Sequence, residues 1–316
     1  MSGMKALSRY WAELNTQDFA RLDPQRAVAV LPLGATEQHG PHLSLNVDTQ
    51  LVDGVVQAAL PHLTAEDQVL VLPTQALGLS TEHQAFAGTL TLSPETLLRV
   101  WCDIGEAVAR AGLRKLVLFN AHGGNVAPMD IVARELRGRC NMLVFSSSWY
   151  QLPLGAAVTG LFSEHEHRFG VHGGDQETSM MLALHPQGVD MAKAENFSST
   201  SEQRAAEFEV LGNGRSAKMG WHMQDYNAKG AAGNAARQWN DNIDQAKGKS
   251  PVPQTYREAL DLASELKAEI EKKGGTLTVI GYSLGGGQAN YCGMMLDLPS
   301  VCFNAAPLGQ ACRDKV

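Results

Sequence analysis

From about residue 26 onward, short β-rich runs alternate with longer amphipathic stretches. Apolar, strand-like runs occupy residues 27–33, 68–72, 115–119 and 141–145. Helix-like stretches lie between them, at residues 50–60, 93–111 and 128–138. Parallel strands need long crossover connections, which are usually helices. The alternation therefore predicts an α/β layered fold with a largely parallel sheet.

The signals at the ends of these stretches support the assignment. Ser93 is a good N-cap and Pro94 suits the first position of a helix. Gly112 follows that helix and is expected to end it. The next run, residues 115–119, is almost continuously apolar, as in strands that are buried on both faces of a sheet.

Composition excludes several classes of protein. Hydrophobic residues make up 44% of the 316 residues and charged residues 19%, which is typical of a soluble globular chain. The net charge of −7 comes without a basic block, so nucleic acid is not an expected partner. No apolar run approaches the roughly 18 residues of a membrane span or forms a signal peptide. Five scattered cysteines without CxxC spacing fit a reducing compartment and predict a cytoplasmic location.

The character of the chain changes near residue 237. Residues 239–253 are polar and contain Gly, Ser and Pro, like a linker. A strong helical pattern follows at residues 255–273, and a short strand is expected at residues 276–280. We therefore predict one domain over residues 1–237 and a partial, appended segment over residues 238–316.

The richest cluster of reactive side chains lies at residues 34–48. Glu37 and His39 are two residues apart, so in an extended segment they project to the same side. Asp48 follows nine residues after His39 and offers a second carboxylate that could bridge two ions. This spacing indicates a metal site.

Two later segments add ligands of the same kind. His122 stands just beyond the strand at residues 115–119, where open α/β sheets place their ligand sites. A third segment contributes His172, Asp175 and Glu177. Mixed imidazole and carboxylate ligands favour zinc, manganese or iron(II) over calcium or magnesium. The residues alone suggest a metal-dependent hydrolase, with ordinary turn histidines and turn glycines as the alternative.

Several of these motifs, in this order, resemble the creatininase (creatinine amidohydrolase) family over about residues 5–235. The stretches that carry the resemblance are residues 31–42, 46–48, 78–92, 120–125, 172–186, 220–221 and 225–234. The resemblance implies a three-layer α/β/α fold and hydrolysis of a C–N amide bond in a small or cyclic molecule. It also implies a homo-oligomer, often a hexamer, although the altered C-terminal part leaves that assembly open.

The resemblance further implies a centre of two divalent ions, zinc and/or manganese, with iron as a further candidate. Glu37, Asp48 and His122 would hold one ion. Asp48 would bridge to the second ion, which His39 would help to hold.

The chain departs from creatininase at two positions. Gly124 stands where creatininase has a glutamate that completes its second metal site, and Val171 stands where it has a glutamate beside the later histidine. We assign the missing ligand to Glu177, the best remaining carboxylate. These departures argue against creatinine itself as the substrate.

Catalytic roles follow from the same resemblance. His172 matches a histidine that passes a proton to the leaving nitrogen after a metal-activated hydroxide adds to the amide carbon. Glu177 belongs to the same catalytic group, and His83 and Trp221 are expected to border the substrate. Residues 164–167, Glu-His-Glu-His, are predicted to be a solvated lid segment and not a further metal motif.

A second reactive motif lies near the C-terminus. Residues 281–285 fit the GxSxG nucleophile elbow around Ser283, with a strand expected before it and a helix after it. Residues 255–309 resemble one section of a bacterial lipase of the α/β-hydrolase class. No histidine follows Ser283 in the chain, so its usual base is missing. A serine esterase and a non-catalytic protein with a degenerate metal site are the alternatives to the amidohydrolase.

Overall fold

The computed structural model describes residues 7–64, 66–212, 215–237, 252, 254–282, 284–303 and 312. The chain forms two compact units: unit 1 holds residues 1–38 and 45–152, and unit 2 holds residues 39–44 and 153–316. The chain thus leaves unit 1 directly after Gln38 and returns at Leu45. This division differs from the boundary at residue 237, which stays a prediction.

Unit 1 is built on a four-stranded sheet in the order β2-β1-β3-β4, and every pair in it is parallel. The strands are β1 (Val28–Leu33), β2 (Val69–Val71), β3 (Lys115–Asn120) and β4 (Leu143–Ser148). The predicted strands are confirmed, although β4 starts two residues later than expected. In β3, alternate residues are only half-buried, so one of its faces is less covered than the apolar run suggested.

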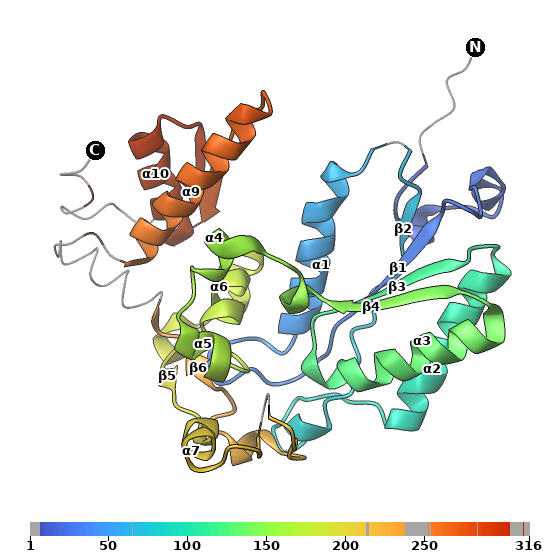
Figure 1. The fold of residues 1–316 in the computed structure, drawn as a ribbon, viewed down its shortest axis with the longest axis horizontal. Helices are drawn as coiled ribbons and strands as arrows, with labels where there is room; N and C mark the ends of the chain where they lie inside the picture. Colours follow the sequence, from blue (N-terminus) through green and yellow to red (C-terminus); the bar gives the residue numbers. More distant parts are fainter. Residues whose placement is uncertain are drawn as a thin grey trace. The chain divides into compact units, whose positions relative to one another are not determined.

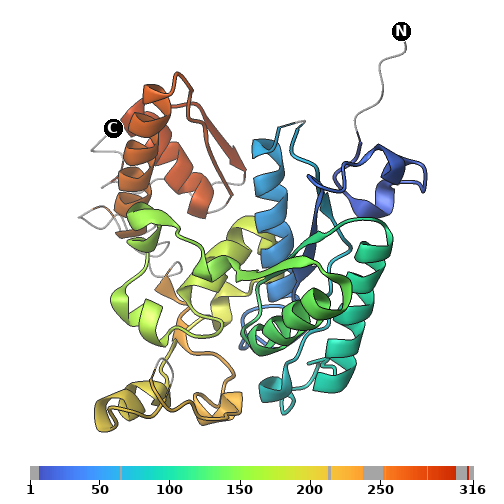
Figure 2. The ribbon, with the colours of Figure 1, turned by 45° about the vertical axis from the view of Figure 1, so that its right-hand side comes forward.

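Helices cover both faces of this sheet, as Figures 1 and 2 show. They are α1 (Val47–Ala59) on one face, and α2 (Pro94–Arg110) and α3 (Val126–Cys140) on the other. The three-layer α/β/α prediction is therefore confirmed. The Ser93 hydroxyl accepts a hydrogen bond from the Thr96 amide at 3.3 Å, which is the cap that the sequence predicted.

The order of the strands determines where a site can form. The chain passes from β1 to β2 on one side and later to β3 on the other side of β1. Leu33 at the end of β1 is in register with Asn120 at the end of β3. The segments after these strands therefore leave the sheet side by side, at the switch point where α/β sheets bind their ligands.

Unit 2 is made of shorter elements. Its first part contains α4 (Gly155–Thr159), α5 (Glu164–Phe169), α6 (Asp175–Leu184), α7 (Thr200–Glu207) and the antiparallel pair β5 (Asn196–Phe197) and β6 (Gly233–Asn234). Residues 39–44 join this unit through a β-bridge between Leu43 and Val189.

The predicted lid at residues 164–167 is wrong for Glu166, because this residue is buried. Its carboxylate accepts hydrogen bonds from the Asp175 amide at 2.6 Å and the Asn234 amide at 2.9 Å. A Cβ atom at Gly174 would lie only 2.2 Å from Glu166 Oε1, so glycine is required there. Glu166 thus joins α5 to α6 and β6, and burial raises the pKa of its carboxyl.

The appended segment forms α9 (Gln254–Lys272), β7 (Val279–Tyr282), α10 (Leu284–Leu296) and β8 (Ser300–Phe303). The predicted strand-turn-helix is confirmed, and β8 pairs parallel with β7 to complete a β-α-β arrangement (Figure 2). Arg237 lies between carboxylates of α6 and α9: it donates to Asp175 at 2.6 Å and also pairs with Glu258. Ser283 lies outside the described residues.

Among the described residues, no helix is both long enough and apolar enough to cross a membrane.

His42 is a buried histidine of unit 2, and its Nε2 lies 3.0 Å from the Thr178 hydroxyl. Burial, assisted by the nearby His39, lowers the pKa of His42 from 6.5 to about 4. The unfolded chain therefore binds a proton between about pH 6.5 and 4 that the folded chain does not bind. The neutral His42 therefore does not reduce the free energy of unfolding above pH 6.5. As the pH falls from 6.5 to about 4, the free energy of unfolding decreases by about 3 kcal/mol at most.

We expect the melting temperature of the metal-free protein to decrease less between pH 7 and 5 in His42→Gln than in the wild type. Calorimetry at several pH values measures this difference. The exposed His62 provides the control, and His62→Gln should follow the wild-type curve. Parallel curves for His42→Gln and the wild type would show that His42 does not titrate in this way.

Candidate metal centre

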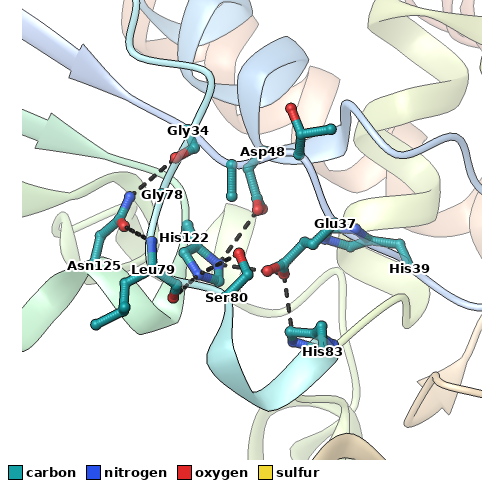
Figure 3. Close-up of polar contacts among 12 residues, drawn as sticks. Gly34, Glu37, His39, Asp48, Gly78, Leu79, Ser80, His83, His122 and Asn125 are labelled. Atoms are coloured by element: carbon teal, nitrogen blue, oxygen red, sulfur yellow. Dashed lines mark hydrogen bonds and ion pairs between the residues drawn. The ribbon is translucent and has the colours of Figure 1, made fainter. Parts of the chain in front are cut away.

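Three buried ligands converge at the carboxyl ends of β1 and β3 in unit 1 (Figure 3). Glu37 follows β1, Asp48 lies in the first turn of α1, and His122 follows β3. His122 Nδ1 lies 3.3 Å from Glu37 Oε1 and 3.4 Å from Asp48 Oδ2. The predicted helix at residues 50–60 begins earlier, at Val47, and this places Asp48 on a rigid element.

The other side of the His122 ring determines which nitrogen can bind a metal. Its Nε2 lies 2.8 Å from the Leu79 carbonyl oxygen, so Nε2 must carry a hydrogen and donate it. In the neutral ring, the lone pair is then on Nδ1, which faces the two carboxylates. A backbone carbonyl that fixes a histidine in this way is the usual support for a metal ligand.

The carboxylates beside His122 Nδ1 favour the binding of a cation there. Burial by itself lowers the pKa of His122, but the carboxylates of Glu37 and Asp48 outweigh burial and raise this pKa well above its usual value. The negative potential that stabilises a proton there also stabilises a divalent ion.

The spacing of the donor atoms also fits a metal ion. Bonds of about 2.0–2.1 Å to a tetrahedral ion place neighbouring donors about 3.3–3.4 Å apart. The distances from His122 Nδ1 to Glu37 and Asp48 are 3.3 and 3.4 Å. These two distances suit a zinc-sized ion bound between His122 Nδ1 and each carboxylate.

Two asparagines hold the loops around His122, and neither of them was predicted to have a role. The Asn120 side chain accepts a hydrogen bond from the His122 amide at 3.0 Å. The Asn125 side chain donates to the Gly34 carbonyl at 3.0 Å and accepts from the Leu79 amide at 3.1 Å. The sequence feature that could have indicated their role is their position on either side of His-Gly-Gly in a turn.

His83 lies behind Glu37 in the same unit. Its Nδ1 is 2.8 Å from Gln38 Nε2, and its Nε2 is 3.5 Å from Glu37 Oε1. The amide nitrogen of Gln38 can only donate, so His83 Nδ1 accepts and the ring hydrogen lies on Nε2, which faces the Glu37 carboxylate. That His83 borders the substrate stays a prediction. Gln38 was not singled out in the sequence.

Unit 2 brings together a second group, His39, His172 and Glu177. Each offers one ligand atom, and these atoms lie within 4.8 Å of one another. The His39 and His172 rings stack with centroids 4.1 Å apart, and His39 Nε2 is 3.9 Å from Glu177 Oε1. The Gly173 amide donates to Glu177 Oε2, which fixes the carboxylate next to the His172 loop. The imidazole of His39 and the carboxylate of Glu177 are suitable donors for zinc or manganese.

The remaining residues of the predicted site take other positions. Asp175 accepts a hydrogen bond from Arg237 and has a structural role. Trp221 is half-buried and packs edge-on against Tyr226, with ring centroids 4.8 Å apart. A substrate-binding role for Trp221 stays a prediction.

Gly124, the main departure from creatininase, is required by packing. A Cβ atom there would lie 2.0 Å from the Leu79 carbonyl oxygen, 2.5 Å from His122 Nε2 and 2.9 Å from Glu82 Oε1. Any side chain would displace the carbonyl that orients His122. A ligand from position 124 is therefore incompatible with this arrangement of the loop.

A sequence model of the creatininase family, described as creatinine amidohydrolase, matches residues 12–252. The chain belongs to the creatininase family. A mycofactocin precursor peptide peptidase from Mycobacterium tuberculosis (strain CDC 1551 / Oshkosh) is 33% identical over 183 residues, which cover 56% of this chain and 66% of the relative. A creatinine amidohydrolase from Pseudomonas putida is 34% identical over 198 residues, or 58% of this chain and 75% of the relative.

Solved creatininase structures share the fold. A crystal structure of creatinine amidohydrolase aligns with a TM-score of 0.57 and 30% identity, over 72% of this chain and 88% of that chain. Related creatininase structures, at 28% identity, include a Zn–Zn form, a manganese form and a variant in complex with creatine. The resemblance to the creatininase family is thus confirmed. The lipase resemblance of residues 255–309 finds no support among these relatives.

We expect Gly124→Ala to weaken metal binding about 10- to 100-fold, on the scale of losing the support of a ligand. The added methyl group would displace the Leu79 carbonyl and free the His122 ring. Titration of the metal-free protein with zinc measures the affinity. Gly123→Ala is the matched control, because a Cβ atom at Gly123 meets no atom within 4 Å. Equal affinities in the two variants would contradict this role of Gly124.

Proposed function

We propose that this chain is a metal-dependent amidohydrolase that cleaves a C–N amide bond with a metal-activated water. The observation that carries the proposal is the arrangement around His122. Its Nε2 is held by Leu79, and its Nδ1 faces two buried carboxylates at a spacing that suits a metal ion. The two buried carboxylates need a cation, and a divalent ion bound at Nδ1 would supply one.

The proposal includes two ions, zinc and/or manganese. Glu37, Asp48 and His122 would hold the first ion, and His39 and Glu177 would hold the second together with the shared Asp48. Only Gln38 separates Glu37 from His39 in the chain. Such ions lower the pKa of a bound water to about 7 and polarise the carbonyl group under attack.

The chain's own residues supply the other chemistry. His172 protonates the leaving nitrogen, a transfer that is typically worth about 10²- to 10⁴-fold in rate. Glu177 keeps the His172 loop in place through the Gly173 amide, and His83 orients the Glu37 carboxylate. These contacts support fixed positions for the reacting groups.

The relatives indicate the class of substrate. The relatives named above are a peptide peptidase and creatinine amidohydrolases. Both kinds of protein act on amide-type bonds, which supports an amide as the substrate here. The glycine at position 124 and the valine at position 171 argue against creatinine itself, and a small, non-peptide amide is our first candidate. A homo-oligomeric state and a cytoplasmic location stay predictions.

Asp48→Asn should remove at least one metal ion per chain and reduce amide hydrolysis at least about 100-fold, because a charge shared by two cations is lost. Elemental analysis of gently purified protein gives the metal content, and a panel of small amides gives the activity. Asp53→Asn is the control on the same helix, since Asp53 instead accepts a hydrogen bond from Thr74. Wild-type metal content in Asp48→Asn would show that another carboxylate bridges the ions.

The serine esterase alternative predicts the opposite responses to a chelator and to loss of the Ser283 hydroxyl. If metal ions carry the reaction, a chelator abolishes hydrolysis and Ser283→Ala leaves it intact. Ester hydrolysis that survives the chelator and disappears in Ser283→Ala would replace the amidohydrolase with a serine hydrolase.

The variants Glu177→Gln and His172→Gln should differ in metal content. Glu177→Gln is expected to lose one ion and retain the other, because the amide is a weaker ligand than a carboxylate. His172→Gln should keep both ions and lose about 100-fold in rate, as expected for a missing general acid. Metal content and rate measured on the same preparations separate these outcomes. Loss of an ion from His172→Gln would make this residue a ligand.

A further inference from the structure

Unit 2 contains a pocket that the proposed reaction does not use. It lies among α5, α7 and the segments at residues 211–212 and 215–226, and three arginines line it: Arg168, Arg204 and Arg215. Ser201 and Tyr226 complete its polar wall. The hollow is small and partly open to solvent, so a ligand group would lie at its mouth. Figure 1 shows α5 and α7.

The charges of this pocket are of one sign. Among the described residues that line it, none carries a carboxylate. Glu202 on α7 pairs with His165 at 3.1 Å. Arg168 and Arg204 each lie 4.9 Å from the centroid of an aromatic ring, Phe169 and Tyr226 respectively. Ring contacts hold these guanidinium groups in place but do not neutralise them.

Arg204 provides a second, independent observation. Its Nη2 atom is buried and has no hydrogen-bond partner among the described residues. A buried donor without a partner is costly, and such donors are rare in native proteins. The Arg215 side chain donates one hydrogen bond, from Nη2 to the Ala205 carbonyl, and its other donors make none to the described residues. A ligand that accepts several hydrogen bonds would satisfy these groups.

We propose that Arg168, Arg204 and Arg215 form an anion site that binds a small oxyanion, a phosphate or a carboxylate. The planar guanidinium group binds such groups through two parallel hydrogen bonds, and Arg204 is positioned for this by its stacking on Tyr226. The anion is either a free ion or the charged end of a larger ligand. The edge contact between Trp221 and Tyr226 places an aromatic side chain beside the site.

Calorimetric titration of the chelated, metal-free protein with inorganic phosphate tests the proposal. Without metal ions, phosphate cannot bind at the metal centre, and no turnover is needed, so the result is independent of the proposed amidohydrolase activity. We expect saturable binding by the wild type and at least about 10-fold weaker binding by Arg204→Gln, the scale of a lost charged hydrogen bond. Arg134→Gln, at an exposed position of α3, is the control and should bind like the wild type.

Two further measurements complete the test. Arg215→Gln, in a loop, should weaken phosphate binding as well, and it serves as the second variant if Arg204→Gln does not fold. An N-acetylated dipeptide and its C-terminal amide distinguish the sources of the anion. Preference for the free carboxylate, lost in Arg204→Gln, identifies the end of a larger ligand, whereas binding of phosphate alone identifies a free ion. Absence of saturable binding of both probes, or equal binding by the wild type and both arginine variants, would overturn the proposal.

Discussion

The hydrogen bond from His122 Nε2 to the Leu79 carbonyl is the interaction on which the candidate metal centre depends. It decides the tautomer of a buried imidazole and leaves Nδ1 to face Glu37 and Asp48. The parallel register of β1 and β3 brings these residues within reach of one another, because Leu33 and Asn120 end adjacent strands at the same level. The sheet thus sets the coarse position of the ligands, and one carbonyl sets the fine orientation.

Small residues and amides maintain this geometry. Gly124 allows the Leu79 carbonyl to approach the imidazole, while Asn125 holds the Leu79 amide and the end of β1. The glutamate that creatininase has at this position would not fit here. A side chain at this position would therefore require the loop around His122 to repack.

In unit 2, a buried carboxylate holds the candidate metal ligands in position. There, the buried Glu166 carboxylate binds the backbone amides of Asp175 and Asn234. This fixes the start of α6, and with it Glu177, close to His172 and His39. A buried carboxylate that satisfies several backbone donors organises a loop more rigidly than apolar contacts do, because each hydrogen bond has a preferred direction.

The sequence by itself determined the parallel α/β layers, the cap at Ser93 and the grouping of metal-ligand residues at strand ends. These features depend on local patterns of side chains, which can be read along the chain. It did not reveal the tautomer of His122, the buried position of Glu166, the packing that requires Gly124, or the three arginines around one pocket. Each of these depends on contacts between residues far apart in the chain, such as His122 with Leu79 or Glu166 with Asn234. Only the tertiary structure decides such contacts, because local propensity carries no information about which distant groups will meet.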